Sequence, residues 1–294
     1  MFFRTLRAWW RLPALALLAC AAGAANAHVH WTRTNSVDAD TIALYHFDSA
    51  TSTAAPVAAS LPAGLGLSVF SGAAQLAPLA DTAGAIFQPQ SLSLPSAQVL
   101  RTTDTVAGLA GDLTIECWFQ WLPALTSCSL EVGLRSGARI VVARDVANPA
   151  NDRFGIAGTH GSFIPAPGFT SWAALGDEEA SLGEWRHLAL AIHSTGIHYD
   201  PVEAHDVYST GSVARLYLNG HATGTFPFAI DVAGLKVHDA SQVTVMVTSG
   251  GMALDELALW RRDWTANGAA ANPFADGRGG AGVAGWILYD DTER

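Results

Sequence analysis

Residues 183–193 read GEWRHLALAIH, and residues 212–224 read SVARLYLNGHATG. In the first segment the letters LALAI alternate large and small apolar residues, the period of two that places one face of a β-strand in a core. The second segment alternates in the same way and reaches Asn219-Gly220, a pair suited to a turn that needs positive φ. We therefore predict two strands of one antiparallel sheet, separated by a polar insertion at 194–211.

Other segments along the chain show the same alternation. The clearest is LTIECWFQW at 113–121, which predicts one strand face of Leu, Ile, Cys, Phe and Trp. Further strands are expected at residues 40–48, 67–70, 85–87, 91–94, 129–134, 139–143, 154–157, 243–247 and 252–264. Gly and Pro punctuate the pieces between them, and no amphipathic helix emerges. The predicted fold class is all-β.

The N-terminal residues 1–27 have the pattern of an export signal. Three arginines precede the short apolar run LPALALLACAAGAA, and small residues at 25–27 offer a cleavage site before His28. No stretch reaches the roughly 20 apolar residues that a membrane-spanning helix needs. The protein is therefore expected to be secreted, periplasmic or at the cell surface, with no membrane span. The alternative is a lipoprotein anchored through Cys20.

The remaining chain suits a single large domain, and that domain is acidic. Residues 28–265 fit a single β-sandwich, since all-β domains of about 200–250 residues are ordinary. Residues 266–294 are Gly/Ala-rich and are expected to pack on that domain or to trail from it. Residues 1–27 hold three arginines and no acid, so their removal leaves 13 basic against 26 acidic residues, a net charge of −13. That sign argues against nucleic acid and anionic lipid as partners.

Two cysteines remain after the export signal. Cys117 and Cys128 lie on the arms of a predicted hairpin, LTIECWFQW and SCSLEVGL, so a disulfide across the hairpin is possible and an oxidising compartment favours it. The alternative is two buried thiols on paired strands, because suitable spacing does not establish the Cβ geometry that a disulfide requires.

Five segments, taken in order, resemble the laminin G-like jelly-roll domain of the concanavalin A-like lectin/glucanase superfamily. They are ALYHFD, LTIECW, EWRHLALAI, LYLNG and LDELALW, and they span residues 43–260. The resemblance implies a two-sheet antiparallel jelly-roll sandwich, which covers its apolar faces by packing sheet on sheet. It does not settle function, because the superfamily includes sugar-binding modules, adhesion domains, glycoside hydrolases and polysaccharide lyases.

The sequence does not show the carboxylate pattern expected of an enzyme of this superfamily. Glycoside hydrolysis generally needs two carboxylates across one sugar bond, and the superfamily's E-x-D-x-x-E strand pattern is absent. The nearest acids are 177–179 with Glu184, on an apparent turn, and Asp255-Glu256, which a regular strand would place on opposite faces. We therefore predict no catalytic residues and a non-catalytic recognition or adhesion module. The alternatives are a divergent carbohydrate-active enzyme and a structural envelope domain.

A recognition module needs aromatic rings and polar groups on its surface, because sugar C–H faces pack on rings while hydroxyls seek hydrogen bonds. Trp172, Tyr199 and Tyr208 lie in predicted loops and are the candidate ligand-binding residues. The expected partner is a glycan or a cell-surface protein. The alternative for each aromatic is a place in the core.

Calcium is a possible cofactor, as the resemblance implies a metal site at the sandwich edge. Asp48 follows the first predicted strand and Asp255 lies in the last, and these strands are often neighbours in such sandwiches, so the two acids are the candidate ligands. A second cluster of possible metal ligands lies in the insertion: Asp200, Glu203, His205 and Asp206. The alternative for that cluster is a solvated acidic loop.

Overall fold

The structure is a computed structural model. It describes residues 28–31, 39–47, 65–71, 91–94, 97–123, 125–158, 162–175, 182–218, 228–249, 251–263 and 286–289. The predicted export signal, the Asn219-Gly220 turn and the strand expected at 85–87 lie outside these residues. The helical content of the described chain is one 3-10 turn, η1 (Pro149–Asn151), and nothing helical there is long and apolar enough to cross a membrane.

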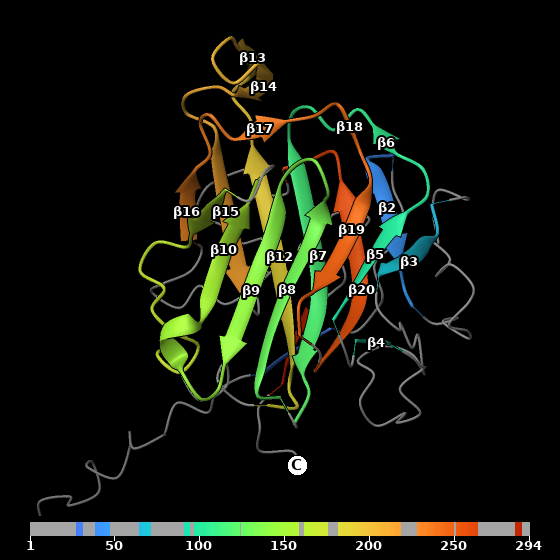
Figure 1. Cartoon of the computed structure of the whole chain (residues 1–294), viewed down its shortest axis with the longest axis vertical. Helices are drawn as coiled ribbons and strands as arrows, with labels where there is room; N and C mark the ends of the chain where they lie inside the picture. The colour runs from blue at the N-terminus through green and yellow to red at the C-terminus, as the bar shows by residue number, and fades with distance from the viewer. Residues whose placement is uncertain are drawn as a thin grey trace, which may run out of the picture.

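The protein is all-β, and its two large antiparallel sheets form a sandwich (Figure 1). One, the β7 sheet, has the order β16 (Phe228–Asp231), β15 (Val213–Leu218), β12 (Trp185–His193), β7 (Leu113–Trp121), β20 (Met252–Trp260) and β2 (Thr41–Tyr45), with β4 (Leu92–Leu94) also paired to β20. The other, the β8 sheet, has the order β11 (Phe163–Pro165), β10 (Arg153–Ala157), β9 (Arg139–Asp145), β8 (Ser127–Leu134), β19 (Val243–Val247), β5 (Gln98–Thr102) and β3 (Leu67–Ser71).

Three small sheets complete the described strands. The first joins β13 (Ile197–Asp200), β14 (His205–Tyr208) and β17 (Lys236–Val237), and it projects from one end of the sandwich (Figure 1). The other two are pairs: β6 (Val106–Ala107) with β18 (Ala240–Ser241), and β1 (His28–Trp31) with β21 (Trp286–Tyr289). The polar insertion expected from the sequence therefore contains a β-hairpin, β13–β14.

The two segments that decide the fold pair as predicted. β12 and β15 are antiparallel neighbours, with Leu188 opposite Leu218 and Ile192 opposite Ala214. The other edge of β12 pairs with β7, and β7 pairs in turn with β20. The strands predicted at 40–48 and 252–264 were also expected to be neighbours. This is confirmed, because β2 pairs with β20.

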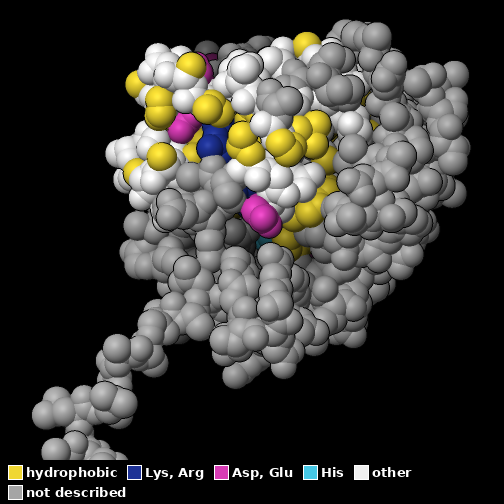
Figure 2. Space-filling view, turned by 90° about the horizontal axis from the view of Figure 1, so that it is seen from below, with side chains coloured by type: hydrophobic (Ala, Val, Ile, Leu, Met, Phe, Trp, Pro, Cys, Tyr) yellow, Lys and Arg dark blue, Asp and Glu magenta, His cyan; other side chains and the backbone are white. Residues whose placement is uncertain are grey.

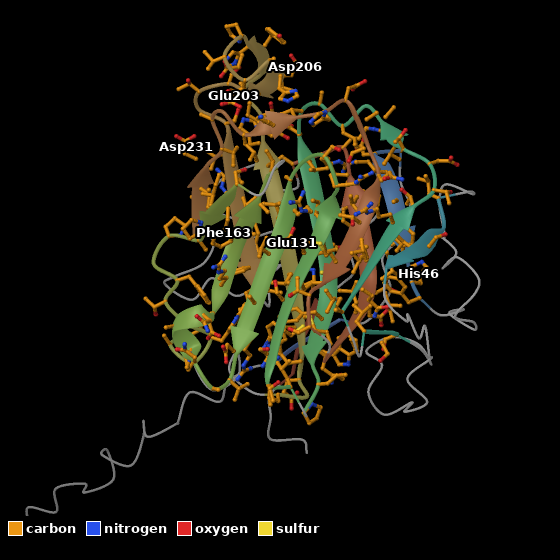
Figure 3. The ribbon with its side chains drawn as sticks, in the orientation of Figure 1. His46, Glu131, Phe163, Glu203, Asp206 and Asp231 are labelled. Carbon is orange, nitrogen blue, oxygen red and sulfur yellow. The ribbon has the colours of Figure 1, made fainter. Side chains whose placement is uncertain are left out.

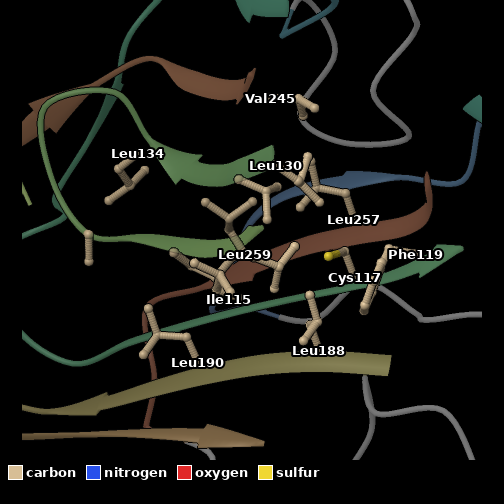
Figure 4. Close-up of a cluster of buried hydrophobic side chains, with 14 of the residues drawn as sticks. Ile115, Cys117, Phe119, Leu130, Leu134, Leu188, Leu190, Val245, Leu257 and Leu259 are labelled. Atoms are coloured by element: carbon tan, nitrogen blue, oxygen red, sulfur yellow. The ribbon is translucent and has the colours of Figure 1, made fainter. Parts of the chain in front are cut away.

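The core lies between the two sheets (Figure 4). The inward residues of β7, among them Ile115 and Phe119, meet those of β8, such as Leu130 and Leu134, and all four are almost fully buried. Full burial of one such side chain contributes roughly 1.5–3 kcal/mol, so the contact between β7 and β8 is a large part of what holds the sheets together.

β20 carries a bulge that shifts its alternation. Leu254 and Leu257 both belong to the core although they are three residues apart, and the register to β7 shifts between Asp255 and Ala258. The extra residue is accommodated at Glu256, whose φ is 47°, in the left-handed region. The strict alternation expected here is therefore wrong, and Asp255 and Glu256 are both buried at the bulge.

The predicted hairpin between Cys117 and Cys128, and the disulfide across it, are wrong. β7 pairs with β12 and β20, whereas β8 pairs with β9 and β19, so the two strands lie in different sheets. Both cysteines are free and buried. Burial raises the pKa of the Cys128 thiol to about 12, and burial, with the nearby Glu116 charge as a smaller cause, also raises the pKa of Cys117.

These thiols should be protonated and shielded in the folded protein. We expect neither Cys117 nor Cys128 to react with an aromatic disulfide reagent at pH 8, because the thiolate is the nucleophile and neither group is exposed. Both should react once the chain is unfolded in guanidinium chloride without reductant. A non-reduced sample that yields no thiol from these positions after unfolding, by peptide mass mapping, would show that they are bridged.

Candidate functional site

The outer faces of the two sheets differ in their access to solvent. On the β7 sheet, the outward residues at its centre are nearly all buried: Leu44, Thr114, Glu116, Trp118, His187, Ala189, Ala191, Tyr217, Ala258 and Trp260. On the β8 sheet, many outward residues are partly or fully exposed, among them Val99, Arg101, Ser129, Glu131, Arg153, Phe163, Pro165 and Met246. We call the first the covered face and the second the open face. Among the described residues, the centre of the open face is accessible to a ligand and the centre of the covered face is not.

The covered face encloses a polar pair. His187 Nε2 lies 3.2 Å from Glu116 Oε2, and each side chain is 1% exposed. The His187 ring also packs at a tilt against Trp118, with ring centroids 5.3 Å apart. Burying these polar groups is tolerated because they contact each other, and their burial keeps them from acting as a surface recognition site.

On the open face, the strand register arranges residues in rows. One row crosses the sheet from Pro165 through Gly155, Val141, Glu131 and Met246 to Val99. The next row crosses from Phe163 through Ala157, Arg139, Gly133 and Thr244 to Arg101. Figure 3 shows Phe163 and Glu131 at similar height on the front sheet. These two rows thus combine one aromatic ring, several apolar side chains and charged groups.

Phe163 occupies the edge of the open face because Gly155 leaves room for it. A Cβ at Gly155 would lie 2.8 Å from the Phe163 ring and 2.3 Å from the Ile164 carbonyl oxygen. The glycine therefore lets β11 and the ring approach the sheet closely. The Arg153 guanidinium carbon lies 5.7 Å from the centroid of the same ring, within the range of a cation–π contact.

Glu131 and Arg139 form the fixed centre of the open face. Arg139 Nε donates to Glu131 Oε2 at 2.8 Å, and its terminal nitrogens donate to backbone carbonyls, including Arg135 at 3.0 Å and Gly158 at 3.0 Å. The guanidinium is thereby held in one position, and one oxygen of the half-buried Glu131 carboxylate is committed to it. This network ties the β8–β9 turn to β10.

A pair of arginines lies at the end of this face nearest the β8–β9 turn. Arg135 Nη1 donates to Gln242 Oε1 at 2.8 Å. Arg101 stands on β5, opposite Thr244. Burial, and to a lesser extent the positive charge of Arg135, lower the pKa of Arg101. Arg135 therefore adds positive charge at the same end of the face as Arg101.

The structure places Trp172 in the core, which corrects its prediction as a surface platform. It is 0% exposed, and its ring packs against Trp121, Phe154 and Phe169 with centroids 5.2–5.8 Å apart. Trp172 Nε1 donates to the Ala143 carbonyl at 2.7 Å. The segment is a loop, as expected, but it folds inward because a tryptophan buries much apolar area while its N–H still finds a partner.

Tyr208 and Tyr199 lie on the projecting sheet with different exposure. Tyr208 is 3% exposed, belongs to the core, and its hydroxyl donates to the Gly111 carbonyl at 3.2 Å, so its prediction as an exposed ligand-binding residue is also corrected. Tyr199 is 60% exposed and remains a candidate. Val202, 89% exposed, lies in the turn that connects the two strands of the same hairpin.

The expected calcium ligands are only partly described. Asp48 lies outside the described residues. Asp255 is buried and its Oδ1 accepts a hydrogen bond from the Glu256 backbone N–H, while Glu256 Oε1 lies 2.7 Å from His46 Nδ1. The β2–β20 edge therefore gathers two acids and a histidine, but among the described residues no group of three or more His, Cys, Asp or Glu is arranged to hold a metal ion.

The acidic cluster of the insertion is spread over the projecting sheet. Glu203 pairs with Lys236 at 2.9 Å, and Asp200 Oδ1 accepts the Val202 N–H at 2.8 Å, as a turn residue does. His205 lies next to His238, with ring centroids 5.5 Å apart. The cluster is thus part of the hairpin's own structure, in agreement with the alternative of a solvated acidic loop.

Sequence reasoning missed another charged group, at one end of the β7 sheet. His193 Nδ1 lies 3.7 Å from Asp112 Oδ1 and 3.5 Å from Asp263 Oδ2. The residues come from the ends of β7, β12 and β20, far apart in the chain.

At the end of the sandwich opposite the projecting sheet, the described surface is mainly hydrophobic or uncharged, with scattered charges (Figure 2).

Comparisons with known proteins concern the fold. The sequence matches no protein-family model and no curated protein. The structure is similar to domain 4 of AbnA, a GH43 extracellular arabinanase from Geobacillus stearothermophilus in complex with arabinotriose, at 15% identity over 76% of this chain and 93% of that chain, with a TM-score of 0.43. It is also similar to a SAP-like pentraxin from Limulus polyphemus, at 15% identity over 67% and 90% of the two chains, with a TM-score of 0.38.

A third similar structure is the sialidase of Trypanosoma rangeli, at 10% identity and a TM-score of 0.44. The match covers 79% of this chain but 34% of that one, so this chain is similar to only part of the sialidase. Likenesses this distant concern the fold and carry no residue roles. The site must therefore be argued from this chain's own geometry.

The different places of Trp172 and Tyr199 give a stability test. We expect Trp172→Ala to lower the free energy of unfolding by about 3–5 kcal/mol, the usual cost of removing a large core aromatic. Tyr199→Ala should change it by less than about 0.5 kcal/mol, as is usual at exposed positions. Urea unfolding followed by tryptophan fluorescence and by circular dichroism measures both. Similar losses for the two variants would contradict the placement of Trp172.

Proposed function

We propose that the protein is a non-catalytic glycan-recognition module that binds its ligand on the open face of the β8 sheet. The observation that carries this proposal is the contrast between the two outer faces. The covered face is buried at its centre, whereas the open face presents Phe163, Arg153 and Glu131 to solvent in a fixed arrangement. A ring beside hydrogen-bonding side chains is the combination that sugars need. The resemblance of five sequence segments to the laminin G-like jelly-roll domain agrees with this function.

The acids of the open face support binding over catalysis. Glu131 already accepts a hydrogen bond from Arg139. The other described acid on this face, Asp145, accepts a hydrogen bond from the Asn151 side-chain amide at 2.8 Å and two more from backbone N–H groups. Two acids held by their own neighbours do not resemble a carboxylate pair placed across one sugar bond. The alternative is a carbohydrate-active enzyme, which an assay for released soluble sugar would detect.

The proposed function is tested by Phe163→Ala and Tyr199→Ala in parallel. We expect the protein to bind at least one polysaccharide in a pull-down panel and to release no soluble sugar from it. Phe163→Ala should weaken that binding about tenfold or more, since loss of an aromatic hot-spot residue costs about 2 kcal/mol or more. Tyr199→Ala should leave it unchanged.

The opposite results lead to different conclusions. Loss of binding in Tyr199→Ala alone would move the site to the projecting hairpin. Sugar release would establish an enzyme. Absence of binding to every polysaccharide would contradict glycan recognition and favour a cell-surface protein or a structural role in the envelope.

For the same module we propose a calcium ion at the β2–β20 edge, held by Asp255 together with Asp48. Carboxylate oxygens are the ligands that calcium prefers, and β2 ends three residues before Asp48, beside the bulge of β20. The left-handed φ values of Phe47 (60°), two residues after β2, and of Glu256 (47°), in β20, place unusual backbone at this edge. The described residues alone do not complete a calcium site.

A thermal unfolding series tests the calcium proposal. At a calcium concentration about 100 times the dissociation constant, binding should stabilise the fold by about 2.7 kcal/mol, which raises the melting temperature by roughly 5–10 °C for a domain of this size. EDTA should reverse the shift, and equal magnesium should give a smaller one because magnesium demands stricter geometry. A melting temperature unaffected by calcium and EDTA in both the original protein and Asp48→Asn would contradict the site.

A further inference from the structure

The open face has a charge opposite to that of the whole chain. Three arginines, Arg101, Arg139 and Arg153, occupy outward positions of its strands, where the described acids are Glu131 and Asp145, and a fourth arginine, Arg135, lies in the turn at its edge. The outward strand positions therefore have a formal charge of +1, while the full chain has a formal net charge of −10. A local charge of the opposite sign to the rest of the surface indicates the charge of the ligand.

Within the described residues, two of these arginines have no acidic partner. Within the described part of the chain, Arg135 makes its side-chain hydrogen bond to the neutral Gln242, and Arg153 makes its contact with the Phe163 ring. Both are exposed. Arg139, by contrast, is neutralised by Glu131 and fixed by backbone carbonyls. The face thus has a neutralised centre and two places where positive charge is available.

The pair Arg101 and Arg135 adds a reason for an anion. Burial is the larger cause of the lowered pKa of Arg101, and repulsion by the positive charge of Arg135 is the smaller one. An anionic group between two guanidiniums removes this repulsion and can accept paired N–H donors, and such charge-assisted hydrogen bonds are about twice as strong as neutral ones. Arg135 bonds to Gln242, two residues before Thr244, which lies opposite Arg101. A carboxylate or sulfate bound at this end of the face would therefore be attracted by both positive charges.

The two positive places are separated along and across the sheet. Arg153 stands on β10 and Arg101 on β5, with β9, β8 and β19 between them. Four strand spacings correspond to roughly 19 Å across the sheet. A single small anion cannot reach both places, but a chain of several sugars with repeated acidic groups can. The Phe163 ring, next to Arg153, provides an apolar contact at one end of that path.

From this geometry we propose that the ligand is an acidic polysaccharide, which lies across the open face from β10 to β5 with anionic groups at Arg153 and at Arg101 and Arg135. This inference rests on the proposed function and specifies its ligand class. The acidic groups are carboxylates or sulfates, which the arginines bind through the same charge-assisted hydrogen bonds. The negative charge elsewhere on the chain opposes non-specific adsorption of the same polymers.

The experiment compares polymers that differ in charge and share a backbone. Affinity electrophoresis or immobilised-ligand binding is measured with polygalacturonate against its fully methyl-esterified form, and with dextran sulfate against dextran. Each polymer is measured both with calcium and with EDTA, so that calcium bridges between carboxylates are distinguished from direct binding by the arginines. We expect at least tenfold tighter binding to one acidic polymer than to its uncharged counterpart, weakening as salt rises. The pair that shows the difference identifies carboxylate or sulfate.

Single-charge variants locate the binding. Arg135→Ala and Arg153→Ala should each weaken binding to the acidic polymer by about tenfold, because a hydrogen bond to a charged group contributes about 1.5–3 kcal/mol. Arg153→Lys should keep part of the affinity. The matched control is Arg261→Ala, which removes the same charge from an exposed side chain bonded to the Ala107 and Gly108 carbonyls at the end of the β7 sheet. It should bind as the original protein does.

The possible failures separate the two proposals. Equal binding of the charged and uncharged polymer in each pair would overturn the acidic ligand and keep glycan recognition. Binding to none of the four polymers, nor to the wider panel described above, would overturn both. Equal weakening by Arg261→Ala and the open-face variants would show a general charge effect and overturn the site. Circular dichroism and unfolding midpoints of each variant confirm that the fold is retained.

Discussion

The structure depends on β7 being hydrogen-bonded along both of its edges. β12 pairs with one edge over eight positions, from Trp185 opposite Gln120 to Ile192 opposite Leu113, and β20 pairs with the other. The inward face of β7 meets the β8 sheet, and its outward face is buried as well. A strand with no free edge and no free face must fit its neighbours on every side, so its register determines that of the whole β7 sheet.

Much of this arrangement could be predicted from the sequence, because burial on one face produces a period of two. The bounds of β7 and β19 agree with the predicted segments 113–121 and 243–247, and β12 pairs with β15 as expected. Periodicity does not reveal which strands are partners. β7 and β8 follow each other within a few residues and look like a hairpin, yet the chain crosses from one sheet to the other between them, so the disulfide prediction failed. A further sign was available in β20, where Leu254 and Leu257 stand three apart and so indicate a bulge.

The candidate site was much harder to predict than the fold. Trp172 was assigned to the surface because it lies in a loop, but a loop can turn inward when a large ring fills a gap in the core and finds a carbonyl for its N–H. Phe163 was overlooked because β11 is three residues long, too short for a periodic signal. Glycine at position 155 is a local sign that another group approaches the sheet, but only the register of β10 and β11 shows that this group is Phe163.

The difference in burial between the two outer faces also explains how one sandwich can be stable and still present a charged surface. Arg101 and Arg135 place two positive charges at one end of the open face, while a contiguous core of buried aliphatic and aromatic residues between the sheets stabilises the fold. The pair is tolerated on the face that solvent reaches, where water screens part of the repulsion. On the covered face the same two charges would lose that screening, and the polar groups found there instead contact each other, as Glu116 and His187 do. Burial of one face therefore limits uncompensated charge to the other, which is the face available to a ligand.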